Sequence, residues 1–415
     1  MNPNSTWILL FGLWPLLWLF WRMVSNRRIG ADQRSTDNHT ANSATSAQQN
    51  DVPQLHQPPS YQLAIVLAIG LCILNPGYGF AGTGRSLSEY QFISHTLHGD
   101  VSSQTGGNRF TGTWLGHLPI PVPADYLIGL DIQKHDFEEG RWSYLRGEHR
   151  RGGWWYYYIY ALCVKMPLGF LALVLIAMML ALQSTISRDL WPHPRQSERA
   201  IQWTRHWRNT FVLIAPGMAV LILVSSQTGF NWYLRYLLPA FPFLYIFASS
   251  AATKLRDRYW GVRLVVTASV VCGITGSLCV FPYSMSFFNL AAGGPLNARN
   301  HLLDSNVDWG QDLLRLRKWT DAHPEAKPLF VKVWSPLPLE TFGINANAIP
   351  VEFRRRTVLN AMPPDLAPGW YAVSVNDLMG YDWAGTSRQP VCVHFQNQTP
   401  TDMVGYSIFI FQVMP

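Results

Sequence analysis

Long stretches without a single Lys, Arg, Asp or Glu constrain the fold of this chain more than any other feature. A helix needs about 20 mostly apolar residues to cross a bilayer. Six charge-free windows approach this length, and they cover residues 7–21, 61–80, 166–182, 211–230, 236–253 and 264–283. Charged residues make up only 14% of the 415 residues. The sequence therefore predicts a mainly α-helical integral membrane protein with about six transmembrane helices.

The first window is short, so a cleaved signal peptide is the alternative interpretation. Residues 1–6 contain no Lys or Arg, and no small-residue cleavage site follows Trp21. Both features favour a transmembrane helix over residues 1–24.

The basic residues indicate how the chain is oriented, because cytoplasmic loops of membrane proteins are rich in Lys and Arg. If the N-terminus is outside, residues 22–60, 183–210 and 254–263 are cytoplasmic. These segments hold 13 Lys+Arg and 6 Asp+Glu, which leaves 19 of each for the rest of the chain. Membrane orientation thus explains the net charge of +7, and no nucleic-acid partner is expected.

The composition divides the chain into four parts. Residues 25–60 are polar and lack an apolar pattern, which predicts a disordered cytoplasmic linker. Residues 61–283 form the transmembrane region, with a large external loop at 85–153. The remaining 284–415 are expected to form a small extracytoplasmic α/β domain. Its expected helix starts near a capping pair, Asp308 and Gln311, and ends before Pro324. Its expected strands cover residues 330–334, 370–375, 391–395 and 406–413.

Two cations lie at the expected outer membrane face. Lys165 immediately precedes the third window and Arg235 immediately precedes the fifth. One interpretation is snorkelling, in which a long cationic side chain reaches back to water. The alternative is that the pair binds the phosphate of a lipid carrier. Tyr236 accompanies Arg235 at the same depth.

Three other features are candidates for substrate contact. Trp154 begins an aromatic run that either forms an interfacial belt or stacks on a sugar. Asp131 is one of several acids in the external loop that could act as a base, although surface ion pairing accounts for most of them. Asp304, Asp308 and Asp312 are spaced by four, and capping or a solvated surface is expected rather than a metal site.

Common catalytic and cofactor motifs are absent from the sequence. It contains no CxxC, HExxH, Walker or GxSxG motif, so no metal or cofactor is expected. Four of the five cysteines lie in or beside apolar windows, which leaves Cys392 without a disulfide partner in the C-terminal region.

Four stretches resemble one known family in sequence and in order. They read LPIPVPADYLIGLDIQ (118–133), GGWWYYYIYALCVKMPLG (152–169), NWYLRYLLPAFPFL (231–244) and LLDSNVDWGQDLLRLRKW (302–319). They are similar to bacterial type-C membrane glycosyltransferases, in particular to glycosyltransferase family 39. That branch includes protein O-mannosyltransferases and is related to aminoarabinose transferases of lipid A. The resemblance covers roughly residues 61–320.

This resemblance implies a bacterial plasma-membrane enzyme. Such enzymes move a sugar from a polyprenyl-phosphate carrier to an extracytoplasmic acceptor. Lys165, Arg235 and Tyr236 fall in stretches that match the family. The acidic external loop that usually follows the first helix of the family has no counterpart here, since residues 25–60 are expected inside. The chain is therefore expected to resemble the C-terminal half of a family member, through a late start codon, a split gene with a partner chain that supplies the catalytic half, or degeneration of a paralogue.

Two other classes of function stay open at this point. A non-enzymatic membrane module could bind a lipid-linked glycan or a partner subunit, and the missing acidic loop favours it. A transporter is the third class. Against it, no two halves of the chain carry matching helices broken by Gly or Pro, and no acid lies inside a predicted span.

Overall fold

A computed structural model describes residues 60–99, 107–186, 196–226, 229, 231–256, 258–349, 366–381 and 393–414. The expected first helix over 1–24 lies outside these residues, as do nearly all of the expected linker and Cys392. The chain forms two compact units, which are described separately. The first comprises Met1–Glu138, Pro192–Val220 and Pro239–Phe243, and the second comprises Glu139–Trp191, Leu221–Leu238 and Leu244–Pro415.

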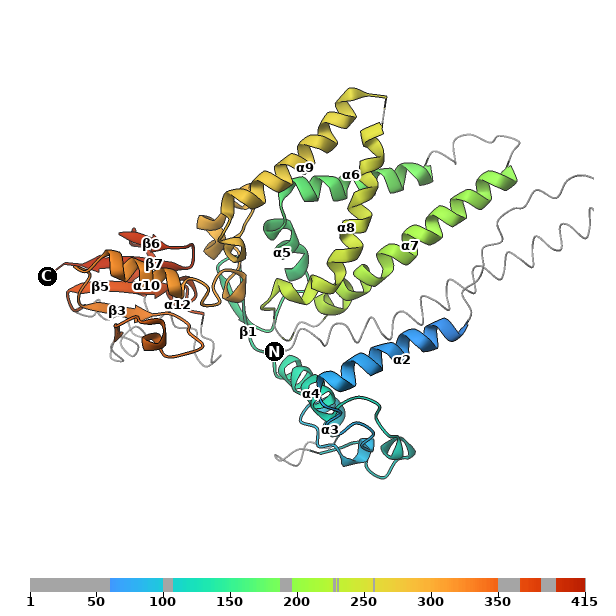
Figure 1. Cartoon of the computed structure of the whole chain (residues 1–415), viewed down its shortest axis with the longest axis horizontal. Coiled ribbons are helices and arrows are strands. Elements are labelled where there is room, and N and C mark those ends of the chain that lie inside the picture. The colour runs from blue at the N-terminus through green and yellow to red at the C-terminus, as the bar shows by residue number, and fades with distance from the viewer. Residues whose placement is uncertain are drawn as a thin grey trace, which may run out of the picture. The chain divides into compact units, whose positions relative to one another are not determined.

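Five of the six apolar windows form helices. These are α2 (Ser60–Gly77), α6 (Leu168–Ile186), α7 (Gln196–Ser226), the continuous run η3 (Leu234–Ala240), α8 (Phe241–Ser249) and η4 (Ser250–Arg256), and α9 (Trp260–Val280) (Figure 1).

Fewer than six helices are long enough to cross a membrane in the part of the chain that the structure describes. Two qualify by length and hydropathy, Leu234–Arg256 and Trp260–Val280. A third exists if α5 (Tyr157–Lys165) and α6 count as one span, which bends by 117° at the break between them. Pro167 occupies that break, where its ring removes a backbone donor. Leu67–Gly77 and Thr210–Ser226 are apolar but shorter.

Helices α6 and α9 pack against each other through backbone in the second unit (Figure 1). A Cβ on Gly169 would lie 1.9 Å from the carbonyl oxygen of Ser269 and 2.4 Å from the amide nitrogen of Gly273. Small residues on both helices allow this close approach, as is common where helices meet in membranes.

The first unit contains part of the external loop. Its short helices are η1 (Leu87–Glu89), α3 (His95–His98) and η2 (Trp114–His117), followed by the longer α4 (Ala124–Glu139). The segment predicted as a large loop over 85–153 thus contains short helices in its described residues, while its external location stays a prediction.

The second unit carries a two-stranded and a five-stranded sheet. Strands β1 (Trp142–Leu145) and β2 (Glu148–Arg151) form the small antiparallel pair. The large sheet has the order β4-β3-β5-β7-β6. Its strands are β3 (Leu329–Lys332), β4 (Asn347–Ala348), β5 (Gly369–Ser374), β6 (Asp402–Val404) and β7 (Ile408–Val413). Neighbours β4, β3 and β5 run parallel, whereas β5, β7 and β6 are antiparallel.

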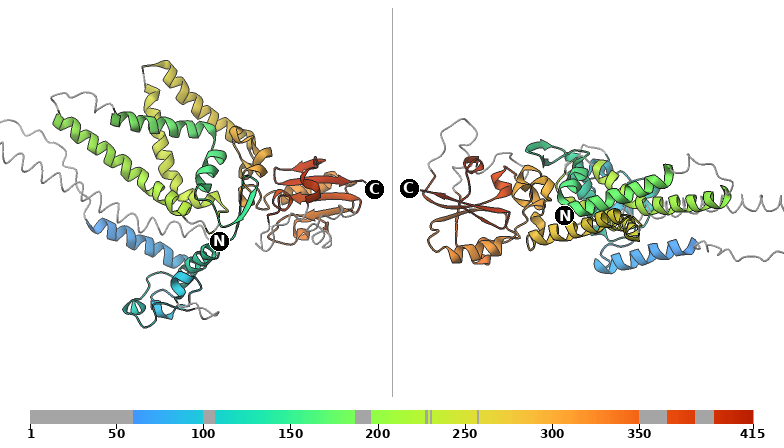
Figure 2. Two further views of the ribbon diagram at one scale, coloured as in Figure 1. Left: turned by 180° about the vertical axis from the view of Figure 1, so that it is seen from behind. Right: turned by 90° about the horizontal axis from the view of Figure 1, so that it is seen from above.

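Helix α10 (Leu313–Ala322) covers one face of this sheet (Figure 2). Leu316 and Trp319 point from it into a core that includes Val331, Ala372 and Ile410. Their spacing of three places the two side chains on one face of the helix. The small α/β domain predicted from the sequence is thus present.

Two local predictions were wrong. Residues 393–396 form a short helix, α13 (Val393–Gln396), where a strand was expected over 391–395. Helix α10 begins at Leu313, after the expected capping pair. Asp308 instead accepts a bond from the amide of Gly310 at 2.9 Å, so it forms a turn before the helix.

The α6–α9 contact generates a first prediction. Replacing Gly169 with Ala should destabilise the protein by about 1–3 kcal/mol, because the added methyl overlaps backbone that cannot move independently. Thermal unfolding of the detergent-solubilised chain measures this. Gly261→Ala in α9 is the matched control, since a Cβ there meets nothing within 4 Å. Equal unfolding temperatures for the two variants would contradict the close packing.

Candidate functional site

Lys165 is the last residue of α5, and its ammonium group is bound to backbone. Nζ donates to the carbonyl oxygens of Met285 at 2.7 Å and Asn306 at 2.6 Å. It also lies 4.7 Å from the centre of the Phe288 ring. An ammonium group has three N–H donors, so one of them has no acceptor among the described residues.

Asn306 is the centre of a hydrogen-bond network in the second unit. Its Nδ2 lies 2.6 Å from the carbonyl oxygen of Trp232 and 2.9 Å from that of Leu303. The hydroxyl of Tyr157 lies 3.1 Å from the same nitrogen, and Oδ1 accepts from the amide of Leu234 at 3.3 Å. With the Lys165 contact, Asn306 ties three of the four stretches that carry the family resemblance together.

Arg235 follows Leu234 directly and lies against two aromatic rings, which are nearly perpendicular to each other with their centres 5.8 Å apart. Its Cζ is 4.1 Å from the ring centre of Tyr233 and 5.3 Å from that of Trp309. Trp309 in turn stacks on Trp334 at 4.8 Å. Within the described ranges, the guanidinium group makes no hydrogen bond or ion pair. Contact with the rings uses none of its N–H donors, which leaves them available to an anion.

Asp304 is a buried acid in the same region. It is 1% exposed and has a positive φ of 62°. Its Oδ2 accepts from the hydroxyl of Tyr381 at 2.9 Å, and its Oδ1 accepts from the amide of Ser305 at 2.7 Å. Burial raises the pKa of Asp304 to about 8, although these hydrogen bonds and the charge of Arg235 oppose the shift. The carboxyl group is therefore mostly protonated at neutral pH.

Asp308 and Asp312 connect the same segment to the sheet. Asp308 accepts a bond from the hydroxyl of Ser374 at the end of β5. Burial raises the pKa of Asp308 to about 6. Asp312 accepts from Ser407 at 2.8 Å and from Arg315 at 2.7 Å. Both acids are 1% exposed. The expected solvated surface is thus wrong for this acidic run, which is buried and hydrogen-bonded.

Tyr236 and Trp154 lie in the core of the second unit. Tyr236 is 4% exposed, and its ring lies 5.6 Å from that of Tyr233. Trp154 is 5% exposed, and the guanidinium of Arg150 lies 4.8 Å from its ring. Its neighbour Trp155 is 66% exposed. Trp155 is therefore better placed than Trp154 for an interfacial belt or for stacking on a sugar.

Asp131 belongs to the first unit and is 1% exposed. Its two oxygens accept from the amides of Ile93 at 2.6 Å and Ser94 at 3.1 Å. On the same helix face, Glu138 accepts from the amides of His95 and Thr96. These acids satisfy amide groups at the start of α3, which have no partner within that helix.

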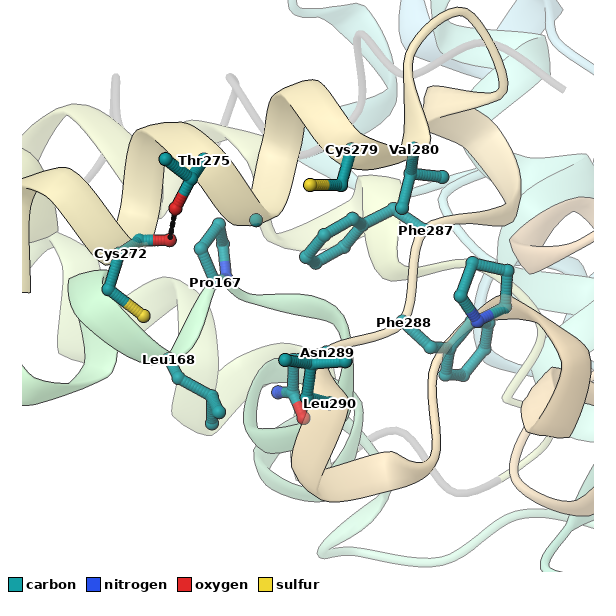
Figure 3. Close-up of a pocket in the computed structure, with 12 residues that line it drawn as sticks. Pro167, Leu168, Cys272, Thr275, Cys279, Val280, Phe287, Phe288, Asn289 and Leu290 are labelled. Atoms are coloured by element: carbon teal, nitrogen blue, oxygen red, sulfur yellow. Dashed lines mark hydrogen bonds between the residues drawn. The ribbon is translucent and has the colours of Figure 1, made fainter.

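An apolar pocket of about 190 Å³ lies beside the α5–α6 break (Figure 3). Phe288, which Lys165 contacts, forms part of its wall together with Pro167 and Leu168. Asn289 fixes this wall, because its Nδ2 donates to the carbonyl oxygens of Cys163 at 2.6 Å and Met166 at 2.9 Å.

Sequence reasoning identified both cations but missed Asn306, Trp309 and the role of Asp304. Arg235 and Trp309 are more than 70 positions apart in the sequence, and nothing local marks them as neighbours. Among the described residues, no group of three or more His, Cys, Asp and Glu side chains could hold a metal ion.

Burial of Asp304 makes the stability of the protein depend on pH. The pKa of Asp304 rises from its ordinary value of 3.8 to about 8 in the folded state. Between pH 3.8 and pH 8, the folded protein therefore holds this proton while the unfolded chain has lost it. The free energy of unfolding falls as the pH rises through this range. Between pH 6.5 and 8, the wild type should lose about 2 kcal/mol of unfolding free energy through this group, and Asp304→Asn should not show this loss. Asn also tolerates the positive φ.

Chemical denaturation at several pH values measures this effect. Asp321→Asn is the matched control, because Asp321 is exposed and forms a surface ion pair with Arg317. If Asp304→Asn keeps the full pH dependence of the wild type, the raised pKa of Asp304 is refuted.

The network around Asn306 generates a further prediction. Asn306→Ala leaves several buried groups without partners and should cost about 3 kcal/mol of unfolding free energy. Asn300→Ala serves as the control, since Asn300 donates only to Asn297 in an exposed turn. A similar small loss in both variants would show that Asn306 is not the centre of the network.

The chain was also compared with known proteins. No protein-family model matches the sequence, and neither a curated protein nor a solved structure matches it significantly.

Proposed function

We propose that this chain is a membrane glycosyltransferase, or the C-terminal half of one. It moves a sugar from a polyprenyl-phosphate carrier to an extracytoplasmic acceptor. The carrying observation is the guanidinium of Arg235, which lies against the rings of Tyr233 and Trp309 and has no anionic partner among the described residues. A planar guanidinium with free N–H edges suits a phosphate, which can accept two parallel hydrogen bonds.

The protonation of Asp304 supports this assignment. A neutral carboxyl group does not cancel the positive charge of Arg235, so the site keeps a net attraction for an anion. Lys165 reaches the same network through Asn306 and has one N–H left for a second phosphate oxygen or a sugar hydroxyl. Tyr236 packs against the Tyr233 ring, with the ring centres 5.6 Å apart.

The remaining parts of the proposal concern placement. Six spans, with the N-terminus and the C-terminal domain outside, agree with the distribution of Lys and Arg in the sequence. The location is a bacterial plasma membrane. The sequence resemblance to family 39 supports both statements.

One observation favours a second candidate, a non-enzymatic module that binds a lipid-linked glycan or a partner subunit. Asp304, Asp308 and Asp312, the buried acids of this network, are all occupied by internal hydrogen bonds. None of them is available as a base toward an acceptor hydroxyl. In a half-enzyme, a separate chain or an upstream segment would supply that base.

A transfer assay separates the two candidates. The chain alone, and the chain with its upstream coding sequence restored, are incubated with polyprenyl-phosphate sugars and an extracytoplasmic acceptor. Transfer only with the restored sequence supports the half-enzyme. Carrier binding without transfer in either form supports the binding module, and neither binding nor transfer refutes both.

Binding of undecaprenyl phosphate in nanodiscs tests the phosphate site itself. Arg235→Gln should weaken binding at least tenfold, since a charge-assisted bidentate contact is lost. Arg317→Gln, which removes an exposed ion pair in α10, should leave binding unchanged. Lys165→Gln should weaken binding less and also lower stability, because two carbonyl contacts disappear. Unchanged affinity in Arg235→Gln would remove this residue from the site.

A further inference from the structure

The pocket beside the α5–α6 break is built from one stripe of α9 and a facing loop. The α9 stripe follows a spacing of three or four residues, typical of one helix face, and includes Cys272, Thr275, Gly276, Cys279 and Val280. The opposite walls come from the break and from the chain after α9 (Figure 3), with Pro167, Leu168, Phe287, Phe288, Asn289, Leu290 and Pro295.

The walls offer almost no hydrogen bond to a ligand. The hydroxyl of Thr275 donates to the carbonyl oxygen of Val271 at 2.9 Å. Asn289 is occupied on both sides, because Nδ2 binds the end of α5 and Oδ1 accepts from the amide of Ala292 at 3.0 Å. A polar ligand would lose its hydration here without compensation. The chemistry of the pocket therefore requires an apolar occupant.

The size of the pocket limits that occupant. Apolar cavities of about 150 Å³ stay dry and bind molecules as large as benzene. A volume of about 190 Å³ thus accommodates a segment of roughly six carbons. The backbone supports this, since a Cβ on Gly276 would meet nothing within 4 Å and so faces open space.

The surroundings indicate where such a segment comes from. Helix α9 is long and apolar enough to cross a membrane, and it exposes Ile274, Leu278 and Phe281 next to the pocket stripe. In a bilayer, the medium around these side chains is hydrocarbon. Acyl chains of phospholipids are its most abundant component, so they reach the pocket at the highest local concentration.

We propose that this pocket holds a segment of an acyl chain from a membrane phospholipid. The lipid fills the space that the 117° bend between α5 and α6 leaves open against α9. It thereby supports the wall formed by Phe288 beneath Lys165. This inference shares the membrane placement of the proposed function but does not depend on sugar transfer.

A photo-crosslinking experiment tests this inference. The full chain is placed in nanodiscs of phosphatidylcholine in which a fraction of the acyl chains carries a diazirine, and crosslinked residues are mapped by mass spectrometry. Phe288 is the diagnostic residue, because it lines the pocket and only 1% of its surface is exposed. Gly276→Leu fills the pocket and should reduce crosslinking at Phe288 at least fivefold.

The matched control is Gly261→Leu, which adds the same side chain in the same helix at another open position and should leave the crosslink at Phe288 unchanged. Equal crosslinking in Gly276→Leu, or crosslinks only at exposed residues such as Leu278, would overturn the proposal. Displacement by geranylgeranyl phosphate, but not by added phosphatidylcholine, would assign the pocket to a prenyl chain and overturn the acyl assignment.

The crosslinking outcome is independent of the phosphate site. Arg235→Gln should weaken carrier binding at least tenfold and leave the Phe288 crosslink intact. A chain that shows the crosslink but no carrier binding would refute the proposed function alone.

Discussion

The arrangement of the second unit depends on how the segment from Asp304 to Asp312 satisfies its polar groups. This segment lies between the end of α5 and the large sheet and is mostly buried. A buried polar group without a partner costs about 1–3 kcal/mol, so a segment with this composition is stable only in a complete network. Asn306 supplies the contacts on the helix side, and the three acids supply those on the sheet side.

Burial of the acids has a chemical consequence. The carboxyl groups of Asp304 and Asp308 have raised pKa values because the charged forms are poorly solvated. A protonated carboxyl group, as at Asp304 near neutral pH, can donate as well as accept a hydrogen bond. Protonation of Asp304 also removes a negative charge that would otherwise offset the charge of Arg235. The interactions that bury Asp304 thus also favour binding of an anion at Arg235.

Much of the fold follows from local patterns, whereas the site does not. Charge-free windows located five helices, and β-branched and aromatic runs located β3, β5 and β7. The windows overstated the number of spans in the described residues because they measure only composition. Two of the apolar windows form the shorter helices Leu67–Gly77 and Thr210–Ser226, which are not long enough to cross a bilayer. The two-residue strand β4 and the three-residue strand β6 are too short to give a pattern.

The network could not be predicted because its partners are far apart in the chain. Asp304 meets Tyr381 and Asp308 meets Ser374, at separations of 77 and 66 residues. Local spacing suggested capping or a solvated surface for Asp304, Asp308 and Asp312 and could not show that the fold would bury them. The same limit applies to Trp309, which the sequence places beside a capping pair and the fold places over Arg235.

The two cations found from the sequence differ in function because their charged groups differ in shape. The ammonium group of Lys165 is compact and can point its N–H bonds at separate carbonyl groups, so it connects two loops. The guanidinium of Arg235 is planar and more weakly hydrated, so it can lie against the rings of Tyr233 and Trp309 while its N–H donors stay free. A lysine at 235 would keep the charge but lose the planar group and its fork of donors. In the sequence the two residues are equivalent charges at one depth. The structure distinguishes them, because Lys165 binds backbone carbonyl groups, whereas Arg235 lies against Tyr233 and Trp309 and is suited to an anion.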